Sequence, residues 1–308
     1  MKKGQQIVVN LIIFLLIGGF IWHIATSINR NEVLYADRDP ATEEVFVSPY
    51  EQIASFEVPD EISRFELDDD KLYIIAGATV YICQADGKEI HRFPISPEAR
   101  DIAVKNRQIY ILYPTYIEVF SEDGTQVYGW KACSELSDYC SFTFTDEHVF
   151  VTDAANKNIC KYTLEGSFVR FIHSPRNFII PSYAFAIENR NDTIYCVNSG
   201  RHQVEMYTPE GSYMGSFGGP GGQSGFFAGC CNPAYIAFSP EGELITSEKG
   251  NPRISSFERS GNFKEVYLTA RMLGGGNKAY EVKAKENLLY IAGKNKITIY
   301  RIKNTVSL

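Results

Sequence analysis

Catalytic and cofactor motifs of fixed spacing are missing from this chain of 308 residues. It contains no CxxC, CxxCH or HExxH sequence, which excludes haem attachment and the simplest zinc sites. Its five histidines are isolated from one another. The glycine-rich stretch at residues 218–222 lacks both the Lys-Ser/Thr pair and the helix of a phosphate-binding loop. Local motifs therefore predict no cofactor.

Basic residues are fewer than acidic ones: the chain has 30 Lys and Arg and 37 Asp and Glu, which gives a formal net charge of −7. Nucleic-acid binding without sequence preference needs clustered Lys and Arg, so we expect no nucleic-acid partner. Only 4 Met and 2 Trp are present, whereas Tyr and Phe number 19 and 20 and favour strands. No long stretch beyond the N-terminus has the 3.6-residue period of a helix. The composition and periodicity together predict an all-β fold.

One long apolar run occurs, at residues 7–28. About 20 residues at 1.5 Å each span a bilayer core of about 30 Å. Lys2 and Lys3 precede the run, which predicts a cytoplasmic N-terminus at 1–6 and export of the rest. We therefore predict a single transmembrane helix at 7–28 and a polar stalk at 29–49. A cleaved signal peptide is the alternative, although no A-x-A cleavage site follows the run, and a buried soluble helix is the third reading.

A short turn of the type Asp/Glu/Ser-Gly recurs between apolar strands. Its five copies lie at residues 85–88, 122–125, 164–167, 209–212 and 259–262. Such turns mark hairpins, and glycine suits them because it tolerates a positive φ. An aromatic residue or Cys83 stands four residues before each turn glycine, and Val or Ile stands seven before it.

When the chain is aligned on these turns, it divides into six similar units of about 37–50 residues, each with up to four strands. This pattern predicts a six-bladed β-propeller over residues 50–303, followed by a short tail at 304–308. The sixth unit, at KITIYRIK, ends before its own turn and lacks a fourth strand. Since the strand Glu51–Val58 precedes the first unit, we predict that it fills the sixth blade and closes the ring.

The segment from Gly215 to Gly261 resembles NHL-repeat propellers. The matching features are Phe217-Gly218, Gly222, Gly225, Phe227, Pro233, Ile236-Ala237, the turn Pro240–Gly242 and Arg253-Ile254. The third unit resembles the same repeat through Val151, Asp153, Ile159 and Gly166. The resemblance implies the propeller fold from about residue 50 onward. The family includes protein- and RNA-binding platforms, lipid-linked enzymes and a zinc-dependent lyase, so the resemblance alone implies no single function.

The resemblance further implies that connections between consecutive blades lie at one mouth of the ring, where ligands approach. The binding residues predicted there are Phe226, Phe227, Asn232, Glu248 and Arg253. We expect this mouth to bind a protein partner from the membrane or the cell envelope. The predicted function is a binding platform, or an accessory subunit of an envelope complex, anchored in the cell membrane with its propeller periplasmic or extracellular.

The alternative function is a propeller enzyme, for which the sequence identifies no catalytic residue. A metal-dependent lyase or hydrolase would hold its ion in the central channel, by ligands that converge from different blades. The polar candidates are Asp153, Asn198, Glu248 and Arg253. A redox protein would instead use the adjacent thiols of Cys230 and Cys231.

Five of the seven cysteines lie in strands or in a connection between blades. Cys83, Cys160 and Cys196 occupy strand positions and are expected to be buried thiols. Cys133 and Cys140 lie between the second and third units, where we predict a disulfide bridge that requires Cα atoms within about 7 Å. Two free thiols in the connection are the alternative.

The remaining pair, Cys230 and Cys231, is adjacent in a glycine-rich turn. Three readings are open for it: a strained vicinal disulfide, two thiolates for a redox or metal role, or plain packing.

Overall fold

The computed structural model describes residues 12–22 and 46–303. The chain divides into two units, Met1–Val47 and Ser48–Leu308. In the first unit, residues 12–22 form a helix with exposed side chains. Neither this helix nor any other in the described parts of the chain is long and apolar enough to cross a membrane. Residues 1–6, the rest of the predicted span at 7–28 and most of the predicted stalk at 29–49 lie outside the described residues.

The second unit consists of six four-stranded antiparallel sheets, which confirms the predicted all-β, six-bladed propeller. The first three sheets are β2(Ile62–Asp68)-β3(Lys71–Ala76)-β4(Thr79–Gln84)-β5(Glu89–Pro94), β6(Asp101–Lys105)-β7(Gln108–Tyr113)-β8(Tyr116–Ser121)-β9(Gln126–Lys131) and β10(Tyr139–Phe144)-β11(His148–Asp153)-β12(Asn158–Thr163)-β13(Phe168–Ile172). The other three are β14(Ile187–Arg190)-β15(Thr193–Asn198)-β16(Gln203–Tyr207)-β17(Tyr213–Gly218), β18(Tyr235–Phe238)-β19(Leu244–Glu248)-β20(Arg253–Phe257)-β21(Phe263–Leu268) and β22(Glu281–Lys285)-β23(Leu288–Ala292)-β24(Lys296–Ile302)-β1(Tyr50–Glu57).

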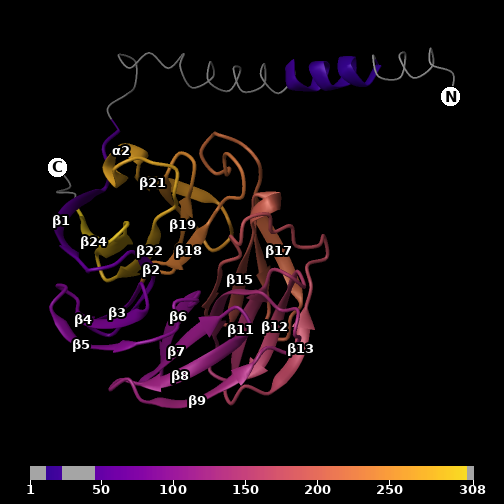
Figure 1. Cartoon of the computed structure of the whole chain (residues 1–308). Helices are drawn as coiled ribbons and strands as arrows, with labels where there is room; N and C mark the ends of the chain where they lie inside the picture. Colours follow the sequence, from indigo (N-terminus) through magenta and orange to yellow (C-terminus); the bar gives the residue numbers. More distant parts are fainter. Residues whose placement is uncertain (1–11, 23–45, 304–308) are drawn as a thin grey trace. The chain divides into compact units, whose positions relative to one another are not determined.

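The first strand of each blade faces the axis of the ring. Strands β2, β6, β10, β14, β18 and β22 contact one another in this circular order. The later strands of each blade lie progressively farther out, as Figure 1 shows for β6 to β9. Side chains at alternate positions of the inner strands therefore point into the central channel, because successive residues of a strand face opposite sides.

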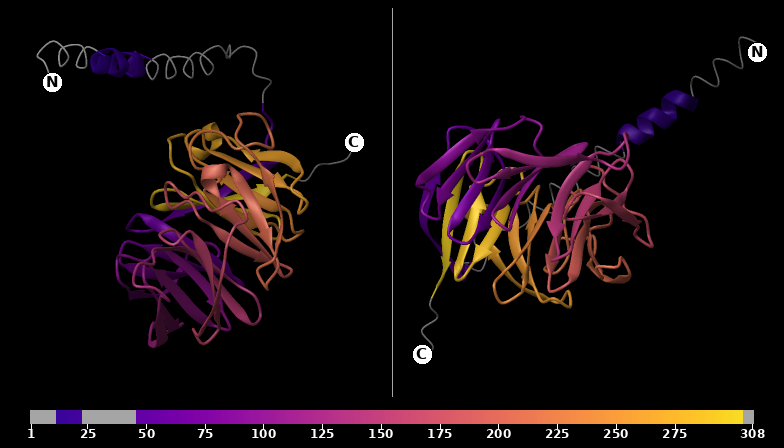
Figure 2. Two further views of the ribbon diagram at one scale, coloured as in Figure 1. Left: turned by 90° about the vertical axis from the view of Figure 1, so that its right-hand side faces the viewer. Right: turned by 90° about the horizontal axis from the view of Figure 1, so that it is seen from below.

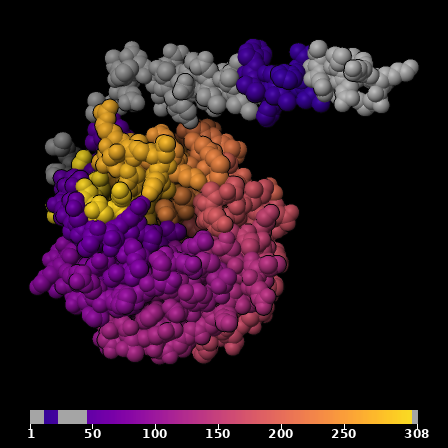
Figure 3. All heavy atoms as spheres, viewed as in Figure 1, coloured from indigo at the N-terminus to yellow at the C-terminus, as the bar shows by residue number. Residues whose placement is uncertain are grey.

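The ring is closed by pairing of the two ends of the propeller. β1 runs antiparallel to β24, with Tyr50 opposite Ile302 and Phe56 opposite Ile297. The indigo and yellow parts of the propeller consequently lie side by side in the right-hand view of Figure 2 and in Figure 3. The outermost strand of the sixth blade thus comes from the start of the domain, which leaves no gap between the first and last blades.

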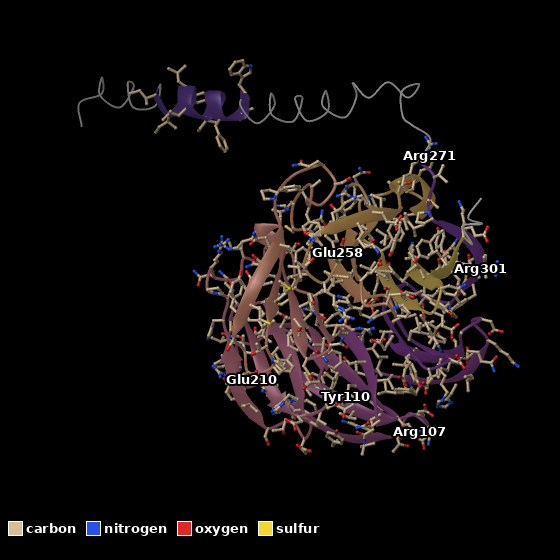
Figure 4. The ribbon with its side chains drawn as sticks, turned by 180° about the vertical axis from the view of Figure 1, so that it is seen from behind. Arg107, Tyr110, Glu210, Glu258, Arg271 and Arg301 are labelled. Carbon is tan, nitrogen blue, oxygen red and sulfur yellow. The ribbon has the colours of Figure 1, made fainter. Side chains whose placement is uncertain are left out.

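Blades are held together by apolar side chains between neighbouring sheets. Tyr110, labelled in Figure 4, belongs to such a cluster between the second and third blades, where its ring lies 4.8 Å from that of Phe144. The thiols of Cys83, Cys160 and Cys196 are buried in clusters of this kind, as predicted. These dry interfaces supply the hydrophobic stabilisation that the single sheets could not provide alone.

The recurring turn glycines take part in the same packing between blades. Gly87 has φ +92°, and a Cβ there would clash with the ring of Phe56 on the preceding blade. Gly166 has φ +86° and lies against Trp130 in the same way. Glycine is therefore required at these turns both for backbone conformation and for close approach of the neighbouring outer strand.

The two faces of the ring differ in the length of their loops. Because strands alternate in direction, the connections between blades lie on the same face as the turn between the second and third strands of each blade. This face carries the long segments 173–186, 219–234 and 269–280, including the short helix α2(Ala270–Leu273). The opposite face carries only the short turns that begin at residues such as 69, 106 and 191. We call the face with the long connections the loop face.

Candidate functional site

The central channel holds a cavity of about 220 Å³ lined by charged side chains. The cavity lining comes from the inner strands of all six blades, and its charged side chains come from four of them, so residues far apart in sequence meet at the axis. The polar residues that matter here are Arg64 and Glu66 on β2, Asp101 on β6, Glu188 on β14, Tyr235 on β18, and Glu281 and Lys283 on β22. No histidine is among the residues that line this cavity.

Lys283 joins two blades to its own. Its Nζ lies 2.8 Å from Glu66 Oε2 and 3.3 Å from Glu188 Oε1. Burial alone would lower the pKa of Lys283, but the neighbouring carboxylates, Glu188 foremost, raise that pKa well above its usual value. The ammonium group is therefore a permanent positive charge at the centre of the channel.

Arg64 is the second positively charged side chain in the channel. Its Nη1 donates to the Tyr235 hydroxyl at 2.9 Å, and its guanidinium carbon lies 4.8 Å from the centre of that ring. Its Nε lies 3.6 Å from Asp101 Oδ1. The other Asp101 oxygen accepts hydrogen bonds from Ser141 Oγ at 2.7 Å and from the Phe142 amide at 3.2 Å. Arg64 and Asp101 thus tie together three consecutive inner strands and β18.

Acids outnumber bases in the channel, since Glu66, Asp101, Glu188 and Glu281 face only Arg64 and Lys283. Burial raises the pKa of Glu188 to about 7, and Lys283 only partly offsets this effect. Burial likewise raises the pKa of Glu281 to about 8, against a smaller opposing effect of Arg64. A buried carboxyl group with a pKa close to neutrality can both release and accept a proton at physiological pH, which is the property that acid–base chemistry uses.

Tyr183 lies at the loop-face end of the cavity. The guanidinium carbon of Arg100 is 5.1 Å from the centre of its ring, and Arg100 Nη2 is 3.3 Å from Asp138 Oδ1. Lys249 Nζ donates to Ser182 Oγ at 2.8 Å, which connects the segment 173–186 to the fifth blade. These contacts link neighbouring loops on the loop face, and we call the loops that surround the channel on this face the rim.

Large apolar side chains are exposed along this rim. They are Leu136 at 79 %, Tyr183 at 56 %, Ile179 at 44 % and Phe226 at 38 % of full exposure. All four lie in connections between blades, where rigid sheets on both sides hold the loop ends in place. The outer strands also expose large apolar side chains, among them Ile90, Val127 and Met214. The four side chains of the rim differ from these in lying on loops, which is where binding residues are concentrated.

The predicted mouth residues are brought together, but mainly to anchor the segment 219–234. Glu248 is buried and lies 2.7 Å from Arg253 Nη2. Arg253 also donates to the carbonyl oxygen of Phe226 at 2.9 Å, and Glu248 accepts from the Ala228 amide at 3.3 Å. The Glu248–Arg253 pair therefore fastens this connection onto the fifth blade.

Asn232 and Phe227 are buried anchors of the same connection. Asn232 Nδ2 donates to the carbonyl oxygens of Ala228 at 2.6 Å and Lys249 at 2.9 Å, and its Oδ1 accepts from the Lys249 amide at 2.9 Å. The ring of Phe227 packs 5.7 Å from that of Phe257. Of the five predicted mouth residues, Phe226 offers the largest exposed apolar side chain.

The structure gives Cys133 a different neighbour from the predicted one. All seven cysteines are free, and Cys133 Sγ lies 3.7 Å from Cys160 Sγ. Cys140 is buried in the cluster between the third and fourth blades, whereas Cys133 packs between the second and third. The predicted bridge between Cys133 and Cys140 is therefore absent, because the two thiols point into different interfaces.

Cys230 is exposed and Cys231 is buried, with φ +66° at Cys231. A side-chain hydrogen bond with Cys231 raises the pKa of the Cys230 thiol, and burial adds to this effect. A raised pKa is opposite to the lowered values of activated cysteines, although the charge of Lys249 acts in the lowering direction.

None of the four polar candidates for a metal, Asp153, Asn198, Glu248 and Arg253, lines the channel cavity. Asp153 is buried and accepts from the amides of Asp138 and Asn156, at 3.0 and 3.1 Å. Asn198 is buried against Glu205, to which its Nδ2 donates at 2.8 Å. Residues 12–22 and 46–303 contain no group of three or more His, Cys, Asp or Glu side chains that could hold a metal ion.

The charged residues of the channel were missed by the motif-based reading of the sequence. The sequence does contain a pattern that could have indicated them. Charged residues occupy alternate positions of the first strands, as with Arg64 and Glu66, or Glu281 and Lys283. Such alternation ordinarily marks a solvated strand face. Only the closure of the ring turns these faces toward one another.

No family model matches the chain, and no curated protein matches it in sequence. Solved structures do match. Virginiamycin B lyase from Staphylococcus aureus is 12% identical with a TM-score of 0.59, over 82% of this chain and 100% of that chain. A protein of unknown function from Bacteroides thetaiotaomicron is 11% identical with a TM-score of 0.62, over 82% and 76%.

The WD40 domain of Neurospora crassa Pan2 is 11% identical with a TM-score of 0.58, over 85% of this chain and 98% of that domain. At such identities the likeness shows the propeller fold alone. Since these neighbours include both a lyase and a WD40 domain, the fold by itself leaves the function open.

Proposed function

We propose that this protein is a membrane-anchored, extracytoplasmic propeller whose loop face binds a protein partner of the cell envelope. The observation that carries the proposal is the set of exposed apolar side chains on that face, Leu136, Ile179, Tyr183 and Phe226. They belong to connections anchored at both ends by rigid sheets, as in a preformed binding surface. Charged groups around them, such as Arg100 and Asp138, supply the polar rim that protein interfaces have.

Capture of partners from detergent-solubilised membranes tests this role. The bait is the intact chain carrying a cross-linker, and the loop-face variant combines Leu136→Ser with Ile179→Ser. The matched control combines Ile90→Ser with Val127→Ser, which alters equally apolar, exposed positions on the outer strands β5 and β9. A partner held by the control but lost by the loop-face variant supports the proposal, and equal retention by both variants contradicts it.

Anchoring by residues 7–28 is the second part of the proposal, and it is supported by the length and apolar character of that run. Cys230 offers a test of orientation because its thiol is exposed. A membrane-impermeant maleimide, applied to intact cells after mild reduction, should label this residue, and Cys230→Ser should abolish that label. Labelling that occurs only after permeabilisation would place the propeller in the cytoplasm and refute this part.

An enzyme is the second candidate, and the observation that favours it is the pair of carboxyl groups in the channel with pKa values of about 7 and 8. The named lyase among the structural neighbours provides a first substrate to try. Incubation of the purified chain with virginiamycin B, followed by chromatography and mass spectrometry, would detect conversion of the compound. Turnover that disappears in Glu281→Gln would favour the enzyme, and absence of turnover would favour the binding role.

A further inference from the structure

The contact between Cys133 and Cys160 joins a loop-face connection to the core of a blade. Cys133 lies in the connection 132–138 and is partly exposed, whereas Cys160 is fully buried in β12. Their sulfur atoms are 3.7 Å apart. The Cys133 amide also donates to the Tyr162 hydroxyl at 3.0 Å, which fixes the backbone of the connection beside β12.

We infer that Cys133 and Cys160 form a disulfide bond in the mature protein and staple the connection 132–138 to the third blade. An S–S bond measures about 2.05 Å, so the sulfur atoms must approach by roughly 1.7 Å. Cys133 lies outside the strands, and rotation of its side chain can supply this movement without shifting β12. The inference rests on the proposed extracytoplasmic location, where disulfides persist.

The bond would form by thiol–disulfide exchange with a disulfide-bearing oxidant of the envelope. The partly exposed Cys133 attacks one sulfur of the oxidant and releases the other as a thiol, giving a mixed disulfide. Cys160 then attacks the Cys133 sulfur, which releases the second thiol of the oxidant. The two cysteines lose two electrons and two protons, and the oxidant gains them.

The buried position of Cys160 determines when this can happen. Burial raises the pKa of the Cys160 thiol well above its usual value, so its nucleophilic thiolate is scarce once the blade has closed. Exchange is therefore fastest while the third blade is folding and Cys160 is still open to solvent. A folded, fully reduced chain should oxidise slowly by comparison.

The staple would stabilise part of the proposed binding surface. Leu136, the most exposed of the apolar rim residues, lies within the connection 132–138. Asp138, which pairs with Arg100, follows at its end. Fixing this connection before a partner arrives lowers the conformational entropy that is lost on binding.

Peptide mapping without reduction tests the inference on the intact chain isolated from membranes. Free thiols are blocked with iodoacetamide during denaturation, so that buried thiols are also reached. We expect one linked pair, Cys133 with Cys160, at a mass two hydrogens below the sum of the peptides, and an alkylated Cys140. Alkylation of both Cys133 and Cys160, or linkage of Cys133 to Cys140, overturns the inference.

Matched variants separate a specific bond from random oxidation. Cys133→Ser should release Cys160 for alkylation and lower the melting temperature under non-reducing conditions. Cys140→Ser should leave the linked pair intact, and a chain in which it abolishes the linkage contradicts the inference. If maleimide labelling locates the propeller outside the cytoplasm while Cys133 and Cys160 stay free, the disulfide inference fails and the proposed function stands.

Discussion

Replacement of Glu281 by glutamine isolates the free energy of holding a carboxyl group inside the channel. Burial raises the pKa of this group from 4.5 to about 8. Its Oε2 accepts a hydrogen bond from the Phe65 amide at 3.0 Å, a contact that a glutamine oxygen can keep. Glutamine therefore mimics the protonated glutamic acid but cannot ionise.

The sign of the effect follows from proton linkage. Because the folded pKa is raised, the native state binds the Glu281 proton more tightly than the unfolded state does. The stability that this provides is fully present below pH 4.5 and is lost as the pH rises through about 8. At about 1.36 kcal/mol per pH unit, the complete interval corresponds to at most about 4.8 kcal/mol. The Glu281→Gln variant has no ionisable group at this position, so its unfolding free energy does not fall in this way as the pH rises.

We expect Glu281→Gln to match the wild type in stability near pH 4.5 and to become more stable as the pH rises. The difference in unfolding free energy should grow by about 2–4 kcal/mol between about pH 5 and pH 9, and level off above pH 8. Urea unfolding of the intact chain in detergent, followed by tryptophan fluorescence at several pH values, measures this difference.

Glu165 provides the matched control for this measurement. Glu165→Gln alters an exposed turn on the opposite face and should give no such pH-dependent difference. A Glu281→Gln chain that is less stable than the wild type at pH 9 would refute the reasoning. It would mean that the electrostatic attraction of Arg64 outweighs burial and that Glu281 is ionised at neutral pH.

Three further substitutions probe the channel, the closure of the ring and the loop face. Lys283→Met should lower the unfolding free energy by about 2–4 kcal/mol, because it leaves two glutamates without their cation. Tyr50→Ala removes a buried ring that lies 4.8 Å from that of Tyr267 and should cost about 2–4 kcal/mol. Asn232→Ala removes three hydrogen bonds and should cost about 2–3 kcal/mol, with new proteolytic cleavage within residues 219–234. Chemical denaturation measures the first two, and limited proteolysis followed by mass spectrometry checks the third.

Each of these has a matched control in the chain. Lys278→Met removes an exposed ion pair with Glu61 and should lower the unfolding free energy much less than Lys283→Met does. Ile53→Ala alters an exposed position of β1 and should cost much less than Tyr50→Ala. Gln223→Ala changes an exposed side chain in the same connection as Asn232 and should leave the proteolytic pattern unchanged. Equal effects of a substitution and its control would contradict the corresponding prediction.

Much of the fold could be predicted from the sequence because the information was local. Strand alternation and turn glycines such as Gly87 specify hairpins within a few residues of each other. Their repetition specifies the number of blades, because each sheet must cover its apolar face with another copy of itself. The burial of Cys83, Cys160 and Cys196 follows from their strand positions in the same way.

The candidate site was harder to predict from the sequence than the fold, because residues that are distant in sequence form it. Glu188 and Glu281 have raised pKa values only because ring closure brings six inner strands around one cavity. A glycine-rich connection predicted the loop face, but not that Asn232 and Glu248 would be its buried anchors.

The sequence by itself determined the strands, the turns and the number of blades, since these depend on side-chain alternation and on backbone conformations that few residues adopt. Tertiary structure alone decided which thiol faces Cys133 and which carboxyl groups keep their protons. The physical reason is that pairing distance and burial depend on the neighbours a side chain meets after the ring closes, and those neighbours come from other blades.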